Sequence, residues 1–63
     1  MTEAARKALA YVAAEVGETF LDDSAWTLIR RAAGVDEVTA SPREVIAALG
    51  FKWQEVRAWR GEL

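Results

Sequence analysis

The sequence predicts an all-α fold, a small domain of four short helices. Three observations support this class: apolar residues recur at intervals of three and four, capping residues precede the apolar stretches, and glycines follow three of them. At 63 residues the chain is long enough for a single domain, residues 1–63. The expected helices cover about residues 3–16, 23–33, 42–49 and 52–60.

The first helix is expected to begin after Thr2 and to stop at Gly17. Its apolar residues share one face at helical spacing. That face comprises Ala5, Leu9, Val12 and Val16, widened by Ala8 and Ala13. The small alanines permit close approach of another helix, in the same chain or in a second copy. Of these two, packing within the chain is the prediction.

The second helix is predicted to follow Asp22 as N-cap, with Leu21 and Trp26 in contact across the cap as a hydrophobic staple. It should end at Gly34, with the positive charges of Arg30 and Arg31 near the negative end of the helix dipole. The residues expected to face the core from this helix and from the loop after it are Leu28, Ile29, Ala32, Val35 and Val38.

The third helix has a complete start signal, Ser41-Pro42-Arg43-Glu44. Serine caps, proline occupies the first helical position, and the glutamate three residues after serine completes a capping box. Gly50 should end this helix in the left-handed conformation, and Phe51 should anchor the turn into the last helix. The residues expected to face inward from the two helices are Val45, Ile46, Leu49, Val56 and Trp59.

Residues 42–60 resemble the helix-turn-helix superfamily of DNA-binding proteins. The family has apolar residues on the inner faces of two helices and a glycine in the turn between them, and this chain matches with Val45, Leu49, Gly50, Phe51, Val56 and Trp59. It departs at Ile46, where the family prefers alanine. With the second helix placed in front, the last three helices resemble the tri-helical core of homeodomain-like and resolvase-like proteins.

The resemblance implies a DNA-binding surface formed by Arg43, Lys52, Trp53, Gln54 and Arg57. It places Arg43 against the phosphate backbone and the other four residues toward the major groove. Gln54 would then contact adenine and Arg57 guanine, each through two hydrogen bonds. Trp53 has a second interpretation of equal weight, as a core residue or as part of a protein interface.

The amino-acid composition excludes most kinds of catalytic and metal-binding sites. The chain has neither histidine nor cysteine, so it lacks the usual zinc ligands, the commonest general base and any disulfide. We therefore expect no enzyme, no metal, no cofactor and no small-molecule substrate. No stretch is long and apolar enough to span a membrane, which predicts a cytoplasmic protein. Abundant arginine and alanine point to a bacterial or phage genome.

Charge is distributed unevenly along the chain, whose net charge is −2. Residues 41–63 are slightly basic, whereas residues 1–40 are acidic. The leading hypothesis is a small sequence-specific DNA-binding transcription regulator whose partner is double-stranded DNA, bound by a monomer or a homodimer. The alternative is a non-catalytic protein–protein interaction module that binds a cytoplasmic partner through its tryptophans or through the alanine-rich face of the first helix.

Overall fold

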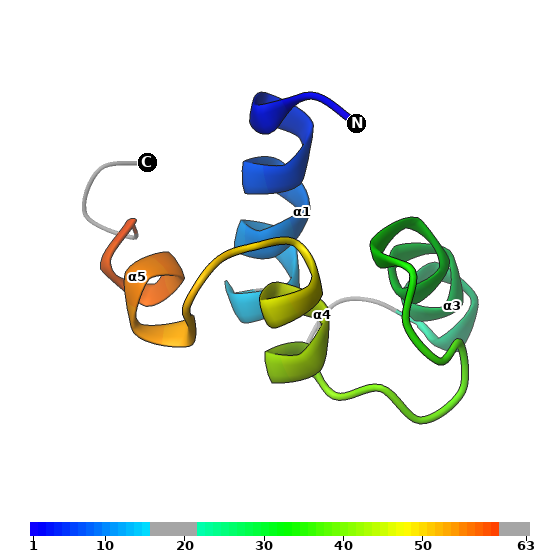
Figure 1. The fold of residues 1–63 in the computed structure, drawn as a ribbon. Coiled ribbons are helices and arrows are strands. Elements are labelled where there is room, and N and C mark those ends of the chain that lie inside the picture. The colour runs from blue at the N-terminus through cyan, green and yellow to red at the C-terminus, as the bar shows by residue number, and fades with distance from the viewer. Residues whose placement is uncertain (16–21, 60–63) are drawn as a thin grey trace.

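The computed structural model describes residues 1–15 and 22–59. In these residues it contains four α-helices and no strand, which confirms the all-α class (Figure 1). The helices are α1 (Glu3–Glu15), α3 (Asp23–Ala33), α4 (Pro42–Ala48) and α5 (Trp53–Ala58). Their ends lie within two residues of the prediction, and positions 16 and 60 lie outside the described residues. No helix in the described ranges is long and apolar enough to cross a membrane.

Three of the predicted helix starts are confirmed in atomic detail, and at the first of them the backbone N–H of Ala5 donates to the Thr2 hydroxyl at 3.1 Å. The Oδ1 atom of Asp22 accepts a hydrogen bond of 2.8 Å from the backbone N–H of Ala25. The hydroxyl of Ser41 accepts from the backbone N–H of Glu44 at 3.2 Å, and the Glu44 carboxylate accepts from the backbone N–H of Ser41 at 3.5 Å. The proposed Leu21–Trp26 contact lies outside the described residues, because Leu21 is among those not described.

Helix α4 is the centre of the fold. Helices α1 and α5 pack on it and on each other, and α3 also packs on it (Figure 1). In this packing α1 contacts both α4 and α5, whereas α3 packs chiefly on α4. The cause lies in α1 itself: Ala10 and Ala13 are almost fully buried, and their small side chains let α1 approach its neighbours closely.

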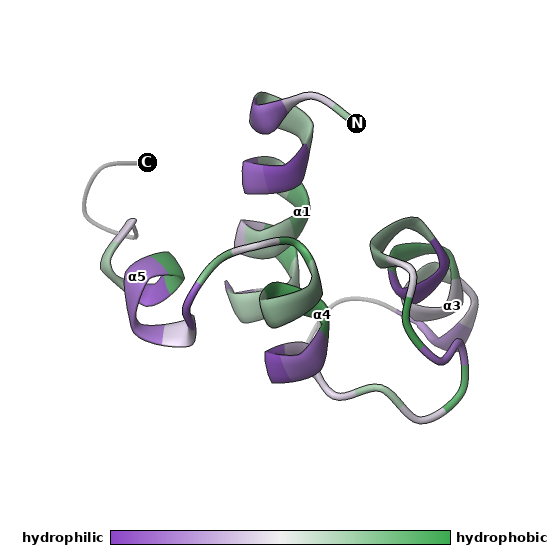
Figure 2. Ribbon diagram, in the orientation of Figure 1, coloured by the Kyte–Doolittle hydropathy of each residue, from purple (hydrophilic) through white to green (hydrophobic). Residues whose placement is uncertain are grey.

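The hydrophobic core lies where α1, α3 and α5 meet α4. Hydrophilic first turns of α1 and α4 lead into more hydrophobic later turns (Figure 2). Every inward residue predicted for the last two helices is buried, and Val45, Ile46 and Val56 are completely so. The buried cluster comprises Ala10, Ala13, Trp26, Ile29, Val45, Ile46, Leu49, Val56 and Trp59.

Several inward predictions for the first two helices are wrong. Ala5 and Ala8 are exposed, and the buried side of α1 is turned toward Ala10 and Ala13. Arg6 lies on that side of α1 and donates a hydrogen bond of 3.0 Å to the carbonyl of Leu49 at the end of α4. A polar residue in this position is invisible to an apolar pattern.

On α3, Leu28 is 60 % exposed and Ala32 is also exposed, contrary to the prediction. The helix buries a narrow stripe containing Trp26 and Ile29, because α4 is the helix that α3 packs against. Partly buried Ala33 continues this stripe. A helix that packs mainly on one other helix buries less of its circumference than its apolar pattern indicates.

The loop between α3 and α4 is held by polar contacts, and Val38 is 79 % exposed instead of packed on the core. Asp36 Oδ1 accepts hydrogen bonds of 2.8 Å from the backbone N–H groups of Val38 and Thr39. These bonds lower the pKa of Asp36 and fix a turn that leaves Val38 outside. Ala40 is completely buried where the loop reaches α4, and Val35 packs partly on the core as expected.

Arg30 and Arg31 fasten the same loop. The Arg30 Nε donates to the carbonyl of Ala40 at 2.8 Å, and its guanidinium carbon lies 5.4 Å from the ring centroid of Trp26. Arg31 pairs with the Glu37 carboxylate through Nε at 2.8 Å and Nη2 at 3.2 Å. This pairing lowers the pKa of Glu37 and raises that of Arg31. Both arginines thus act through tertiary contacts that the sequence did not predict.

Candidate functional site

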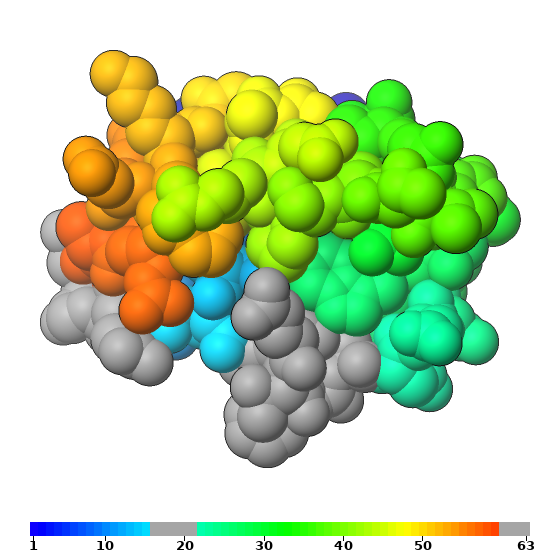
Figure 3. All heavy atoms as spheres, turned by 90° about the horizontal axis from the view of Figure 1, so that it is seen from below, coloured from blue at the N-terminus to red at the C-terminus, as the bar shows by residue number. Residues whose placement is uncertain are grey.

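The five residues expected to bind DNA lie on α4 and α5. Arg43 is in the first turn of α4, Lys52 is the N-cap of α5, and the other three lie on α5 itself. The side chains of Arg43, Lys52, Gln54 and Arg57 are exposed, and Trp53 is half-buried. Atoms of the start of α4 and of α5 lie side by side on one surface of the molecule (Figure 3).

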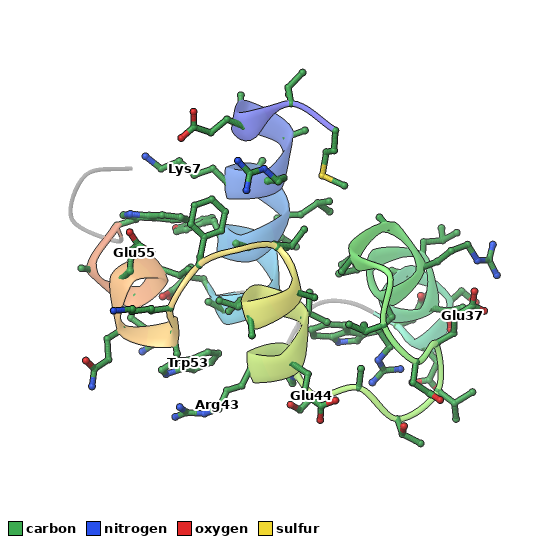
Figure 4. The ribbon with its side chains drawn as sticks, in the orientation of Figure 1. Lys7, Glu37, Arg43, Glu44, Trp53 and Glu55 are labelled. Carbon is green, nitrogen blue, oxygen red and sulfur yellow. The ribbon has the colours of Figure 1, made fainter. Side chains whose placement is uncertain are left out.

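Three of the five residues are in contact, and we call Arg43, Trp53 and Arg57 the Trp53 cluster. The guanidinium carbon of Arg43 lies 4.5 Å from the centroid of the Trp53 ring, and that of Arg57 lies 5.9 Å from it. Figure 4 shows Arg43 and Trp53 next to each other, directed away from α1. These are cation–π interactions, in which the electron-rich face of an aromatic ring attracts a positive charge. The cluster therefore holds two positive charges over one indole at the surface.

Arg57 also joins α5 to the end of α1. Its Nη1 donates to the carbonyl of Ala14 at 3.3 Å and lies 3.4 Å from the Oε1 atom of Glu15. The Glu15 side chain is 4 % exposed, whereas that of Arg57 is 43 % exposed. Glu15 is a functional candidate that the sequence analysis missed, because no local pattern links two residues this far apart in the chain.

Two carboxylates lie close to the basic residues, but both are engaged by helix N-termini. Glu55 Oε1 accepts from the backbone N–H of Lys52 at 3.3 Å, and Glu44 completes the capping box with Ser41. Figure 4 shows Glu55 on the opposite side of α5 from Trp53. The positive end of each helix dipole offsets part of their charge, so the surface beside the Trp53 cluster is less acidic than the sequence indicates.

A second surface feature is an apolar hollow of about 390 Å³ on α1. It is lined by Ala4, Lys7, Ala8, Tyr11 and Val12. Ala8, which was predicted to widen the inner face of the first helix, thus lines this hollow instead, whereas Ala13 is buried as predicted. A further hollow of about 300 Å³ lies between α3 and the following loop and has polar walls that include Asp23, Arg30 and Glu37.

Nothing in the described ranges, 1–15 and 22–59, forms a group of histidine, cysteine or acidic side chains able to hold a metal ion. No protein-family model, no curated protein and no solved structure matches this chain. The function is therefore argued from the arrangement of residues on α4 and α5.

Proposed function

We propose that this chain is a small sequence-specific DNA-binding regulator that places α5 in the major groove. The observation that carries the proposal is the division of residues at the corner between α4 and α5. Val45, Leu49 and Val56 are buried there, while the polar and basic side chains stay at the surface. A helix that begins just after a tight turn and exposes donor side chains suits groove binding.

Each polar residue of this surface has a distinct role in the proposal. Gln54 makes no side-chain hydrogen bond within residues 1–15 and 22–59, so its amide is available for the two bonds that identify adenine. Arg43 lies in the first turn of α4 and would contact phosphates, which fixes the position of the protein on the duplex, whereas Lys52, the N-cap of α5, would face the major groove. Trp53 holds the two guanidinium groups that lie over it.

The net charge of the protein determines how strongly we expect it to bind DNA of any sequence. With a net charge of −2, non-specific attraction to DNA is weak, and recognition depends on base contacts made by a few residues. Two copies on a two-fold symmetric site would raise the affinity by linking two weak contacts. The proposal therefore includes a homodimer, in which two copies of the short helix α5 together make enough contacts with DNA for specific binding.

The test begins with selection of bound duplexes from a random-sequence library, followed by fluorescence anisotropy on the enriched sequence and on a shuffled one. Gln54→Ala should weaken binding to the enriched sequence by about 1–3 kcal/mol and leave the thermal melt unchanged. Arg43→Ala should weaken binding to both duplexes alike and reduce the slope of log Kd against log salt by about 1.

Arg31→Ala is the matched control, because it removes the same charge from α3 at the far side of α4 from α5 (Figure 1). It should leave the preference for the enriched sequence intact. If the wild-type protein enriches no sequence and binds no duplex at low salt, the DNA-binding proposal is wrong.

Glu55→Gln provides a gain-of-binding prediction. Glutamine at this position keeps an oxygen to accept from the backbone N–H of Lys52, so the helix start should survive. Loss of one negative charge near the phosphates should strengthen binding to any duplex by up to about 1 kcal/mol at low salt. Anisotropy titrations at several salt concentrations measure this effect.

Glu3→Gln is the comparison for Glu55→Gln, since Glu3 lies in the first turn of α1 and is remote from α5 in Figure 1. It removes the same charge and should change affinity much less. If both substitutions strengthened DNA binding equally, the net charge of the protein alone would determine its affinity. The proposal that α5 is the helix in contact with DNA would then lose this support.

The hollow on α1 favours a second candidate function, binding of a helical protein partner. Its walls are mainly the apolar side chains of Ala4, Ala8, Tyr11 and Val12, all on a helix whose opposite side is buried. Trp59 is only 8 % exposed and offers little surface to such a partner, which leaves Trp53 and the α1 hollow. If the protein does not bind DNA, we expect a helical protein to bind in the α1 hollow. Ala8→Lys places a charge in that hollow and should abolish this binding without changing the melting temperature.

A further inference from the structure

A buried carboxylate outside the α4–α5 corner holds one of its exposed arginines. Glu15 lies at the C-terminal end of α1 with its side chain 4 % exposed, and its Oε1 is 3.4 Å from Nη1 of Arg57. The same nitrogen donates to the carbonyl of Ala14 at 3.3 Å. The end of α1 therefore offers a carboxylate and a carbonyl to a single nitrogen of a residue on α5.

Among the residues that the structure describes, the rest of the Arg57 guanidinium has no hydrogen-bond partner. Arginine has five N–H donors, of which Nη1 carries two. Within residues 1–15 and 22–59, the Nε and Nη2 groups of Arg57 make no hydrogen bond. These two nitrogens form the parallel donor pair that a planar guanidinium uses for two-point contacts. One edge is held by α1, and the opposite edge keeps a complete pair of donors.

We propose that Glu15 is a positioning residue of the DNA interface, which holds Arg57 so that its Nε and Nη2 donors meet the O6 and N7 acceptors of a guanine. This inference rests on the proposed DNA-binding function and deepens it by naming the residue that positions Arg57 and the two donors that select the base. The contact with the Trp53 ring, 5.9 Å from the guanidinium carbon, further limits the rotation of Arg57. A side chain fixed before binding loses less entropy on binding, which favours the correct base.

The inference explains why arginine and not lysine stands at position 57. A lysine has one nitrogen, which cannot contact the end of α1 and still present two donors in a plane. Arg57→Lys should therefore keep the charge and the salt dependence of binding while losing the preference for guanine. Loss of that preference with an unchanged salt slope separates base recognition from simple electrostatic attraction.

The experiment measures discrimination, the ratio of Kd values for the selected duplex and for the same duplex with the contacted guanine replaced by adenine. Changes in overall charge alter both Kd values and cancel in this ratio. We expect Glu15→Ala to reduce discrimination about tenfold, within the range that one base contact supplies. In an Arg57→Ala background, the same substitution should have no further effect, because its action passes through Arg57.

Glu15→Gln keeps the shape and an oxygen acceptor, so it should retain part of the discrimination that Glu15→Ala loses and guards against unfolding by the alanine variant. Glu3→Gln should leave the ratio unchanged. The inference is overturned if Glu15→Ala lowers the melting temperature but retains full discrimination, while Arg57→Ala abolishes it. That result is distinct from failure of the proposed function, in which the wild-type protein itself shows no preference for any duplex and both proposals fall.

Discussion

Trp59→Ala should reduce the free energy of unfolding by about 3–5 kcal/mol, the range for emptying an aromatic core site. Trp59 is 8 % exposed, and its ring meets that of Phe51 edge-on, with centroids 5.0 Å apart and an angle of 83° between the rings. The Nζ atom of Lys7 lies 4.7 Å from the Trp59 ring centroid. Removal of this side chain takes away contacts with the turn, α1 and the core together.

A loss of this size is close to the whole stability of such a small protein. Native domains have about 0.05–0.15 kcal/mol of stability per residue, which gives roughly 3–9 kcal/mol for this chain. Trp59→Ala should therefore be substantially unfolded at room temperature by circular dichroism and should show a much lower urea midpoint. A melt within a few degrees of wild type would show that α5 does not depend on Trp59 for its place.

Trp53→Ala is the matched control for Trp59→Ala. It removes the same kind of side chain from the other end of α5, where Trp53 is half-buried at the surface and in contact with Arg43 and Arg57. It should cost clearly less stability than Trp59→Ala. The comparison separates the indole that supports the core from the one that organises the candidate site.

The helices and most of their ends could be predicted because their signals are local. Asp22, Ser41 and Glu44 bond to backbone groups three residues away, and Gly34 has a positive φ of 78° immediately after α3. Such contacts form within one turn of chain, so neighbouring residues determine them. The inner faces of α4 and α5 were equally predictable, since the apolar residues of these two short helices are the ones that pack into the core.

The arrangement of the helices was harder to predict, because it depends on contacts between distant segments. Arg6 hydrogen-bonds to Leu49, 43 positions further along the chain, and this contact helps determine which side of α1 is buried. The apolar pattern of α1 favours Ala5 and Ala8, but the arginine shifts the buried side toward Ala10. A cation that satisfies the last carbonyl groups of a helix can outweigh the burial of two methyl groups.

The candidate site shows the same division between local and tertiary contacts. Exposure of Gln54 follows from helical spacing, because it lies two residues from Val56 and so on the other side of α5, whereas Lys52 is the extended N-cap residue that precedes the helix. The contacts of Arg57 with Trp53 and with Glu15 depend on the crossing of α5 over the end of α1. Spacing alone indicates an outward arginine, whereas the structure shows that one of its nitrogens is already engaged.

Gly50→Val should give the second largest loss of stability. Gly50 has a φ of 93°, in the left-handed region where a β-branched residue is strained by about 1–3 kcal/mol. A Cβ atom at this position would also lie 3.1 Å from Nη1 of Arg6, the nitrogen that donates to the Leu49 carbonyl at 3.0 Å. The substitution therefore strains the turn and pushes on the contact that joins α1 to the end of α4.

Gly34 supplies the control that separates these two effects. Its φ is 78°, so valine there is strained in a similar way, but a Cβ atom at Gly34 would meet nothing within 4 Å. Gly50→Val should accordingly lower the urea midpoint more than Gly34→Val does. The excess should shrink in an Arg6→Ala background, because the colliding guanidinium is then absent and its hydrogen bond is already lost.

The comparison of Gly50→Val with Gly34→Val tests whether α1 stabilises the turn between α4 and α5. Arg6 also lies over Phe51, with its guanidinium carbon 5.6 Å from the ring centroid, so one side chain contacts both sides of Gly50. Equal losses at Gly50 and Gly34 would mean that Arg6 moves aside without cost. A larger loss at Gly50 that disappears with Arg6 would show that an arginine of α1 stabilises the turn between α4 and α5, the two helices that carry the candidate DNA-binding surface.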